Sequence, residues 1–369
     1  MTERHVRLDV EALETFCREI LMLEGLSDED AQSAATVLVA ADVRGIASHG
    51  VGRLSRYVKG LQAGLMRPNA PIEVVSDTPT ALVLDAHGAM GAPVSVRALK
   101  AVIDKAHTAG AAFGCVRDSN HFGIAGYYAL LAVEHGMLGI AMTNTAALAV
   151  PTFGRQVMFG TNPLAFAAPA HKERAFLLDM STTVVTRGKL ELYDRMDKEL
   201  PPGWAVDRHG RTARQTGSLL EDMFYRVGGG ILPLGGEGEE MSGHKGYGLA
   251  VMVDILCGVL AGAGFGPQLA DLADSSTRVG HFFGALRIDT FRDLDAFRRD
   301  MDRMLQDLRN TPTAEGQERV YYAGLKEFEH EEECRRRGVP VLAKSNDVLC
   351  QISHDHGVAA PPVLTEEDL

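Results

Sequence analysis

The sequence predicts an α/β fold in which a mixed-sheet domain is joined to a mostly helical domain built from both ends of the chain. Three observations lead to this prediction. With 369 residues, the chain is long enough for two domains. Short β-rich runs alternate with amphipathic helices between residues 76 and 304, which is typical of helices layered on a buried sheet. Residues 1–75 show helical periodicity instead, and the charged segment 305–369 is expected to return over these first helices.

The first 75 residues predict three helices. Residues 9–25 and 28–45 are amphipathic, and Ser27 with an acidic residue three places later forms a capping-box-like start for the second helix. A third helix is expected to run through Tyr57 and to end before Pro68.

The alternating region predicts the sheet and its covering helices. Strands are expected at 81–85, 112–117, 138–143, 165–169, 175–179 and 281–289, and helices at 91–109, 123–135, 246–262 and 292–308. The stretch from Gly246 to Gly266 is apolar apart from Asp254. Its glycines and its central acid favour a buried helix of a globular protein over a transmembrane span.

Composition and charge narrow the class of partner. The 37 Lys and Arg residues face 49 Asp and Glu residues, so the net charge is −12, which argues against nucleic acid or an anionic membrane as the main partner. The five cysteines form no C-x-x-C pair, and their odd number is not a disulfide framework. The first residues lack the apolar region of a signal peptide, so we expect a cytoplasmic protein.

Several common site motifs are missing. No G-x-G-x-x-G lies between a predicted strand and helix, so a Rossmann dinucleotide site is not predicted. There is also no P-loop, no H-E-x-x-H and no G-x-S-x-G. Cys350, His354 and His356 have a spacing that could bind a metal, but they lie in a polar C-terminal stretch without a fourth ligand, and we expect no metal site.

Three polar clusters flanked by glycines remain. In the first, Ser48-His49-Gly50 precedes Arg53 and Tyr57. If a helix begins near Gly50, the imidazole, guanidinium and phenol share one face and could protonate a carbonyl while pairing a carboxylate. The alternative is a polar stripe that faces solvent.

The second and third clusters each open a predicted helix. Asp118 to Gly123 contains Asn120 and His121 and follows a strand, where ligands commonly meet an α/β sheet. His121 is an acid/base candidate or a capping residue. The segment Gly243 to Gly248 places Lys245 among glycines at a helix start, which would suit an anionic ligand. A glycine-rich turn with an exposed lysine is the alternative.

Taken in order, these clusters resemble the malate/L-lactate dehydrogenase family, which also holds sulfolactate, ureidoglycolate and diketogulonate oxidoreductases and lacks a Rossmann fold. The matching pieces are Ser-His-Gly-Val-x-Arg, Asn-His-Phe-Gly, Phe-Gly-Thr-Asn-Pro and His-Lys-Gly-Tyr-Gly, with Thr143-Asn144-Thr145 and Asp179-Met180-Ser181 between them. The resemblance extends from Asp30 to about Pro340.

The resemblance implies an NAD or NADP cofactor bound by residues 76–304. It implies acid/base roles for His49 and His121, of which we favour His49 as the proton donor. Ser48, Arg53 and Tyr57 would bind substrate, with Arg53 holding its carboxylate. The implied cofactor-binding residues are Asn120, Thr145, Asp179, Met180, Ser181 and Lys245.

The activity implied is transfer of a hydride between NAD(P)H and C2 of a small 2-oxo or 2-hydroxy acid by a homodimer. A cyclic-imine reductase or a non-catalytic binding protein on the same scaffold are the alternatives. Arg187-Gly188-Lys189 is more similar to the hydroxyacid branch, because the imine reductases have Asp where this chain has Lys189. Many relatives have Gly-Glu in a cofactor-contacting turn where this chain has Gly324-Leu325, so a carboxylate expected there is missing.

Overall fold

The computed structural model describes residues 4–269 and 278–365, so the outermost residues of the predicted helical domain, 1–3 and 366–369, lie outside it. A seven-stranded sheet forms the centre of the molecule, in the order β2-β3-β4-β10-β5-β6-β7. Its strands are β2 Glu73–Asp77, β3 Ala81–Asp85, β4 Ala111–Ser119, β5 Met137–Thr143, β6 Leu164–Ala168, β7 Phe176–Met180 and β10 Val279–Arg287. β3 and β4 are parallel and the other neighbouring pairs are antiparallel. The predicted mixed-sheet α/β fold is therefore confirmed.

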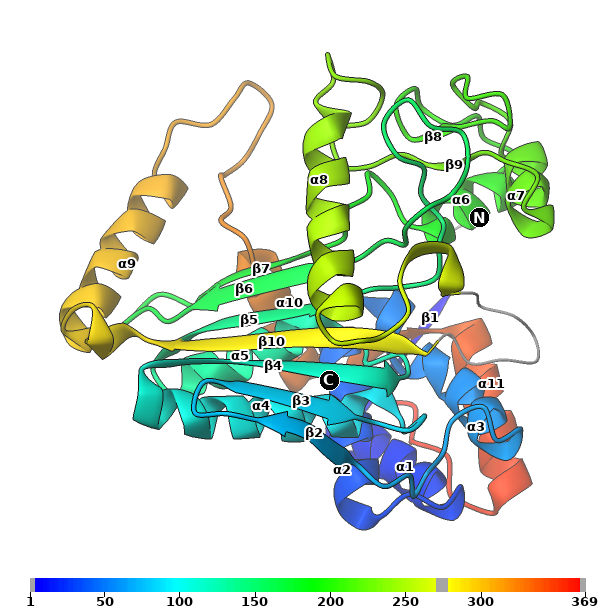
Figure 1. Cartoon of the computed structure of the whole chain (residues 1–369). Helices are drawn as coiled ribbons and strands as arrows, with labels where there is room; N and C mark the ends of the chain where they lie inside the picture. Colours follow the sequence, from blue (N-terminus) through cyan, green and yellow to red (C-terminus); the bar gives the residue numbers. More distant parts are fainter. Residues whose placement is uncertain (1–3, 270–277, 366–369) are drawn as a thin grey trace.

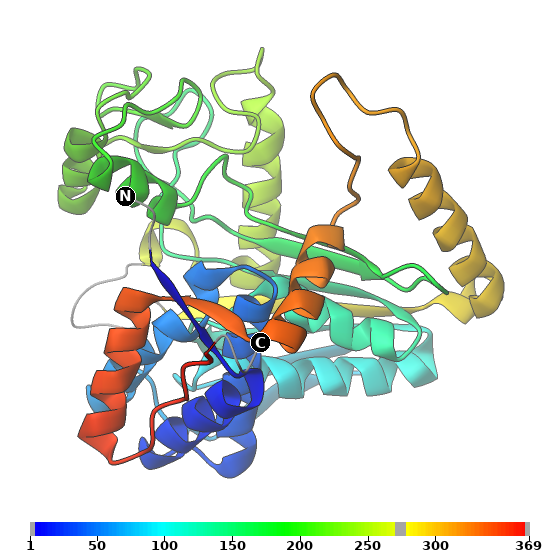
Figure 2. The ribbon, with the colours of Figure 1, turned by 180° about the vertical axis from the view of Figure 1, so that it is seen from behind.

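Alternating side chains direct the two faces of this sheet to different layers. Phe283 of β10 packs in the main core with α4 (Gly91–Ala109) and α5 (Ala125–Glu134). Its neighbour Phe282 points the other way, into a cluster with α8 (Gly243–Asp254) and the π-helical turn Ile255–Val259. In Figure 1, α8 crosses in front of the sheet, and Figure 2 shows α4 and α5 on the opposite face.

The predicted buried helix 246–262 differs from the structure in two respects. α8 ends at Asp254, and the π-helical turn continues it. One side of the segment is exposed, since Ile255 and Val259 keep 50% and 58% of their accessible surface. The helix covers the sheet from one side, so only the row with Val253 and Cys257 is buried against the strands.

The helices near both ends of the chain lie together beside the sheet. They are α1 Val10–Leu23, α2 Asp28–Val43, α3 Leu54–Gln62, α10 Leu325–Arg337 and α11 Ala343–His356. The Ser27 hydroxyl accepts a hydrogen bond from the N–H of Asp30 at 3.3 Å, as the capping pattern predicts. β1 (His5–Leu8) pairs antiparallel with β11 (Val339–Leu342), and Figures 1 and 2 show the blue and red segments side by side. Within the described residues, no helix is both long and apolar enough to cross a membrane.

The remaining elements were not all predicted. The segment between β5 and β6 and the chain beyond β7 together form a small separate core that includes Phe159, Leu190 and Ile231. Its elements are α6 Arg187–Arg195, β8 Ala205–Val206, α7 Thr216–Tyr225 and β9 Gly230–Ile231, and α9 Leu294–Arg309 follows β10. β8 and β9 are only two residues long, which is too short for a periodic pattern.

The direction of the strands gathers the predicted site at one end of the sheet. β3, β4, β5 and β7 all run the same way, because each antiparallel partner between them reverses the direction twice. The loops that follow β4, β5 and β7 carry His121, Thr145 and Ser181, so these residues share one edge.

A candidate active site around two histidines

The Ser48–Arg53 segment is not the start of a helix, contrary to the sequence prediction. Two 3₁₀ turns, Ala47–His49 and Val51–Arg53, precede α3, which begins at Leu54. Gly50 separates them in an extended conformation, with φ −85° and ψ −157°. His49 therefore does not share a helical face with Arg53. The Arg53 Nε instead donates back to the carbonyl of Ser48 at 2.7 Å, which folds the turn onto itself.

The structure nevertheless brings both predicted histidines together. The rings of His49 and His121 stack with centroids 5.3 Å apart. The Tyr57 hydroxyl lies 2.7 Å from Nδ1 of His121, and the Ser48 hydroxyl lies 2.9 Å from Nδ1 of His49. Both imidazoles remain partly exposed, whereas Tyr57 is fully buried. With Arg53, which is bonded to Ser48, these four residues form one cluster across the two 3₁₀ turns, α3 and the loop after β4.

The hydrogen bonds of His121 determine which nitrogen carries its proton. The N–H of Gly123 approaches Nδ1 of His121 at 3.3 Å, and a backbone N–H can only donate. Nδ1 is therefore an acceptor, and the Tyr57 hydroxyl donates to the same atom. In the neutral ring the remaining proton lies on Nε2, which leaves an N–H donor for a ligand.

Burial and nearby cations keep both imidazoles neutral. Burial, followed by the charge of Arg53, lowers the pKa of His49 to about 4. The pKa of His121 is also lowered, chiefly by burial and then by the charges of His49 and Arg53. The burial of Tyr57 raises the pKa of its phenol to about 12, so it remains a hydrogen-bond donor at neutral pH. The cluster is a set of neutral donors beside a guanidinium.

A third histidine, which the sequence analysis missed, supports this cluster from below. His281 of β10 is fully buried, and its ring stacks on Phe122 at 4.6 Å. Its two nitrogens lie 2.8 Å from Thr143 Oγ1 and 2.9 Å from Ser119 Oγ. Burial lowers the pKa of His281 to about 3. Both ring nitrogens have hydrogen-bond partners, so His281 connects β4, β5 and β10. The sequence signal that could have identified this residue is a single histidine within the apolar run of a predicted strand.

Three of the residues predicted to bind the cofactor lie at the end of β7 and in the loop after β5. Asp179 and Met180 end β7, and the Asp179 carboxylate accepts the N–H of Gly126 at 2.7 Å, at the start of α5. The Thr145 hydroxyl accepts the N–H of Thr161 at 2.9 Å, in the loop after β5.

Of the other three residues predicted to bind the cofactor, Asn120 and Ser181 form hydrogen bonds within the protein, and Lys245 lies at the start of α8. The Asn120 amide donates to the carbonyls of Gly88 and Ala89, each at 2.9 Å, and the Ser181 hydroxyl donates to the carbonyl of Thr183 at 3.1 Å. Lys245 is exposed in the first turn of α8. Their contacts with a cofactor stay predictions.

A cavity of about 280 Å³ lies beside Asp179. Apolar side chains of Ile46, Ile124 and Leu177 form much of its wall, and Arg44 and Glu327 add charge. Burial raises the pKa of Asp179 to about 6. Gly324 borders the same cavity. The chain therefore places Glu327 on this wall, although it lacks the acidic residue expected directly after Gly324.

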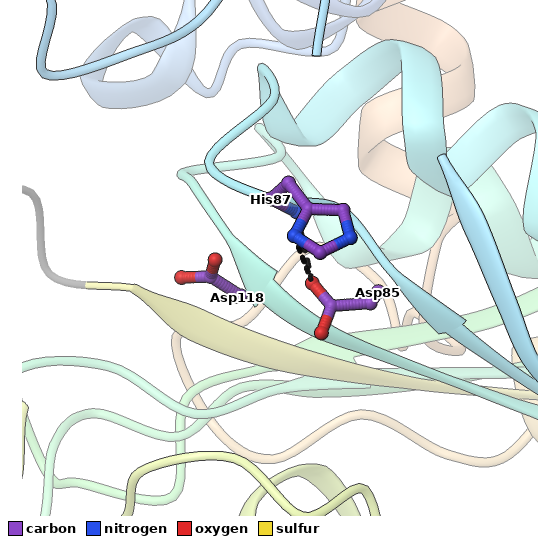
Figure 3. Close-up of side chains that lie close together, drawn as sticks. All are labelled: Asp85, His87 and Asp118. Carbon is purple, nitrogen blue, oxygen red and sulfur yellow. Dashed lines mark hydrogen bonds and ion pairs between the residues drawn. The ribbon is translucent and has the colours of Figure 1, made fainter. Parts of the chain in front are cut away.

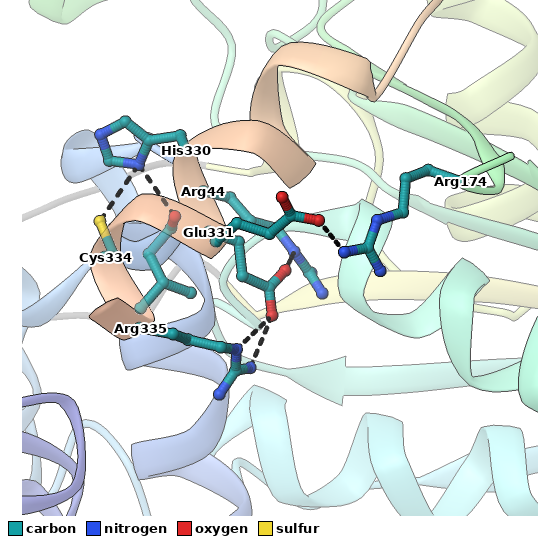
Figure 4. A network of polar contacts seen from close by, with 8 residues as sticks. Arg44, Arg174, His330, Glu331, Cys334 and Arg335 are labelled. Atoms are coloured by element: carbon teal, nitrogen blue, oxygen red, sulfur yellow. Dashed lines mark hydrogen bonds and ion pairs between the residues drawn. The ribbon is translucent and has the colours of Figure 1, made fainter. Parts of the chain in front are cut away.

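A charged network backs this cavity on the side of α10. Arg44 pairs with Glu331 at 3.3 Å, and Glu331 also binds Arg335, as Figure 4 shows. Arg174 pairs with Glu332 in the same group. The network attaches the end of α2, just before the Ser48–Arg53 turn, to α10.

A second cluster at the same sheet end has the side chains of a metal site. Ligand atoms of Asp85, His87 and Asp118 lie within 4.8 Å of one another (Figure 3). Asp85 accepts from Arg117 at 2.8 Å, however, and Asp118 lies 3.4 Å from Arg278. These pairs neutralise both carboxylates, so the group is an ion-pair network.

Comparison with known proteins shows the family of the chain. The family model for malate/L-lactate dehydrogenase matches residues 8–350. The chain belongs to this family. It is 42% identical over 356 residues to a malate dehydrogenase of Pyrococcus abyssi, covering 96% of each chain. The family membership identifies it as an oxidoreductase.

Two further comparisons show the shared fold and a relative with different chemistry. The crystal structure of malate dehydrogenase from Entamoeba histolytica superimposes with a TM-score of 0.92 at 32% identity, covering 97% of this chain and 100% of that one. A Delta(1)-pyrroline-2-carboxylate/Delta(1)-piperideine-2-carboxylate reductase of Pseudomonas syringae is 33% identical over 249 residues, which is 67% of this chain and 68% of that protein.

Proposed function

We propose that this protein is an NAD(P)-dependent dehydrogenase that interconverts a small 2-oxo acid and its 2-hydroxy acid. The stacked pair of His49 and His121 beside Arg53 carries this proposal. A guanidinium suits a carboxylate, and two imidazoles suit the carbonyl next to it. The malate dehydrogenases among its relatives support the same reaction class.

The nicotinamide cofactor would contact the loops after β5 and β7 and enter the cavity beside Asp179. The fit rests on the cavity itself, whose apolar wall and buried carboxylate suit an aromatic ring and ribose hydroxyls. Asn120, Thr145, Met180, Ser181 and Lys245 are the other proposed contacts. When bound, the reduced nicotinamide supplies the hydride for carbonyl reduction.

The residues of the chain then control the proton. Arg53 binds the substrate carboxylate and so fixes the position of the carbonyl. The Nε2–H of His121 points a neutral donor at the carbonyl oxygen, because Tyr57 and Gly123 occupy Nδ1. Burial is the larger cause of the lowered pKa of His49, and the charge of Arg53 is the smaller. An anionic substrate on Arg53 offsets the smaller cause, which favours a protonated His49 as the donor to the developing oxyanion.

Reduction of a cyclic imino acid is the second candidate, favoured by the similarity to the Pseudomonas syringae reductase. Lys189, exposed at the first turn of α6, weighs against it on the resemblance described above. Non-catalytic binding is the third alternative. The proposed enzyme is a homodimer that uses NAD or NADP in the cytoplasm.

A substrate panel distinguishes these functions. Oxidation of NADH and of NADPH is followed at 340 nm with pyruvate, oxaloacetate and a cyclic imino acid. Turnover of a 2-oxo acid supports the proposal, and turnover of the imino acid alone replaces it with imine reduction. Cofactor binding without turnover on any of the three would indicate a binding protein.

A further inference from the structure

Asp42, near the end of α2, lies under the turn that carries the candidate catalytic residues. The residue keeps only 6% of its accessible surface. One carboxylate oxygen, Oδ2, accepts the N–H of Val51 at 2.6 Å. Val51 begins the second 3₁₀ turn, which ends at Arg53, and the first turn ends at His49. The carboxylate thus bonds the junction between the two turns.

Gly50 allows the carboxylate to come this close. Its φ of −85° is one that any residue adopts, so backbone conformation does not require glycine here. A Cβ at this position would overlap the Asp42 carboxylate, however. The glycine of the Ser-His-Gly motif is therefore needed for the approach of Asp42 to the backbone.

Burial disfavours the ionised form of Asp42, and the hydrogen bond from Val51 only partly offsets this effect. Burial raises the pKa of its carboxyl to about 7, and the Val51 N–H opposes that rise. Burial, and to a smaller extent the charge of Asp42, raises the pKa of the Cys17 thiol on α1 and of the Cys334 thiol on α10. Among the described residues, no cation pairs with the Asp42 carboxylate, and an unpaired buried acid lowers stability at neutral pH. Its benefit is therefore local, in the geometry of the turn.

We propose that Asp42 is a positioning residue that holds His49 and Arg53 in the geometry required for catalysis, by bonding Val51 across Gly50. This inference rests on the proposed function. It predicts that losing the acceptor displaces Arg53 and Ser48, so substrate binding and turnover suffer while the cofactor loops on the other strands stay unchanged. Keeping an acceptor without a charge should preserve the site.

Four variants test the bond, in the full-length protein. Asp42→Asn keeps a carbonyl oxygen for Val51, whereas Asp42→Ala removes it. We expect Asp42→Ala to lower kcat/KM for the 2-oxo acid at least tenfold, with KM raised and the dissociation constant for NAD(P)H unchanged. Asp42→Asn should stay within about threefold of wild type. Gly50→Ala should be as damaging as Asp42→Ala, but the double variant Gly50→Ala/Asp42→Ala should be no worse than either, because the overlap is gone.

Asp302 provides a matched control at the opposite end of the sheet. Asp302 is 8% exposed, and its carboxylate accepts three backbone N–H groups, those of His171, Lys172 and Glu173, in the turn between β6 and β7. Asp302→Ala should lower the melting temperature and leave kcat/KM per folded molecule unchanged. If Asp42→Ala also leaves kcat/KM and KM unchanged, the positioning role is wrong.

Hydrogen exchange makes the test independent of the reaction. The Val51 amide should exchange slowly in wild type and in Asp42→Asn, and at least tenfold faster in Asp42→Ala, with core amides of β4 unaffected. A wild-type protein without turnover on the substrate panel would overturn the proposed function, but unchanged Val51 exchange in Asp42→Ala would overturn the bond itself. If Asp42→Ala does not fold, the comparison of Gly50→Ala with Asp42→Asn decides: equal activity of these two contradicts the proposal.

Discussion

Two clusters at the same end of the sheet contain histidine, yet they differ in what their neighbours leave available. In the Asp85–His87–Asp118 cluster, Asp85 is bonded to Arg117, Asp118 to Arg278, and His87 Nε2 lies 2.9 Å from Glu73. In the histidine pair, Nδ1 of each ring is bonded to a hydroxyl. The first cluster has matched opposite charges, and the second has neutral rings beside a cation.

The difference shows that the polar groups of the ion-pair cluster have a structural role, whereas the two imidazoles can respond to a ligand. A carboxylate paired with arginine is already stabilised, and it gains little from a ligand. A neutral imidazole whose pKa is lowered by burial and a nearby cation responds strongly to an incoming anion. Residue type alone would rank the first cluster higher as a site. The partners of each group reverse that ranking, and mutations can test it.

The largest expected effect follows from removing an imidazole. His49→Ala and His121→Ala should each lower kcat by roughly 10²–10⁴-fold, the usual contribution of a general acid. The protein should stay folded and bind cofactor, measured by fluorescence titration with NADH. His87→Ala, as the counterpart in the ion-pair cluster, should keep kcat near wild type. Wild-type kcat in both active-site variants, on a substrate that the enzyme turns over, would refute the mechanism.

The buried His281 should make the free energy of unfolding depend on pH. Its pKa is lowered to about 3 in the folded state and returns to 6.5 on unfolding, so the unfolded chain binds the extra proton between these values. Stability contributed by neutral His281 is therefore complete above pH 6.5 and decreases as pH falls toward 3. Urea unfolding at pH 6 and pH 4 should show about 2–3 kcal/mol more loss in wild type than in His281→Gln. Equal losses would mean that His281 is not held neutral.

Arg53→Ala tests the cation that distinguishes the histidine pair. Loss of a charge-assisted hydrogen bond costs about 1.5–3 kcal/mol, so KM for the 2-oxo acid should rise roughly 10- to 150-fold. Turnover should slow as well if the carboxylate orients the carbonyl. Steady-state kinetics with Arg53→Lys as the control would show partial retention, because lysine keeps the charge without the planar fork. Unchanged KM would remove Arg53 from the substrate site.

Lys245→Ala asks whether the site extends to α8. If Lys245 makes a charge-assisted hydrogen bond, its loss should weaken the binding free energy of the cofactor by about 1–3 kcal/mol. The dissociation constant should then rise roughly 5- to 150-fold. Isothermal titration with NADH and NADPH measures this directly. Lys189→Ala, another exposed lysine at a helix start, should leave the affinity unchanged. The same affinity in both variants would exclude Lys245.

The smallest effect is expected in the ion-pair cluster. Asp118→Asn removes the pair with Arg278, and asparagine tolerates the positive φ of 51° at this position. We expect kcat/KM within twofold of wild type, with no response to added Mg²⁺ or to EDTA. Metal-dependent activity that the substitution abolishes would show that this cluster, and not only the histidine pair, has chemical capacity.

Much of the fold could be predicted because long periodic segments carry their own information. The helix at 91–109 and the strand at 81–85 match the structure to the residue. The turn at Gly50 could not be predicted as such, because it depends on Asp42, a residue whose burial follows from packing among three helices. The π-helical continuation of α8 has no local sequence signature, and the short strand β1 pairs with β11, which is distant in sequence.

The site was predicted from its motifs, and the geometry adds what the motifs do not contain. Ser48, His49, Arg53, Tyr57 and His121 lie together in the structure, although the helical face first used to connect them does not exist, and their roles stay predictions. His281 could not be inferred, because its importance comes from Thr143 and Ser119 on two other strands. The same holds for Glu327, which reaches the cavity from a helix distant in sequence.

The pairing of β1 with β11 has a consequence for synthesis of the chain. His5 and Leu342 are partners across nearly the full length of the sequence, so closing this two-stranded sheet carries a large loop-closure entropy. On the ribosome the central sheet can form while the last helices are still being made, but the contacts of the first helices with α10 and α11 form only after those two helices emerge. The Ser48–Arg53 turn therefore acquires its final support late, and nascent chains that stall before residue 339 would hold a formed sheet with an unfinished active site.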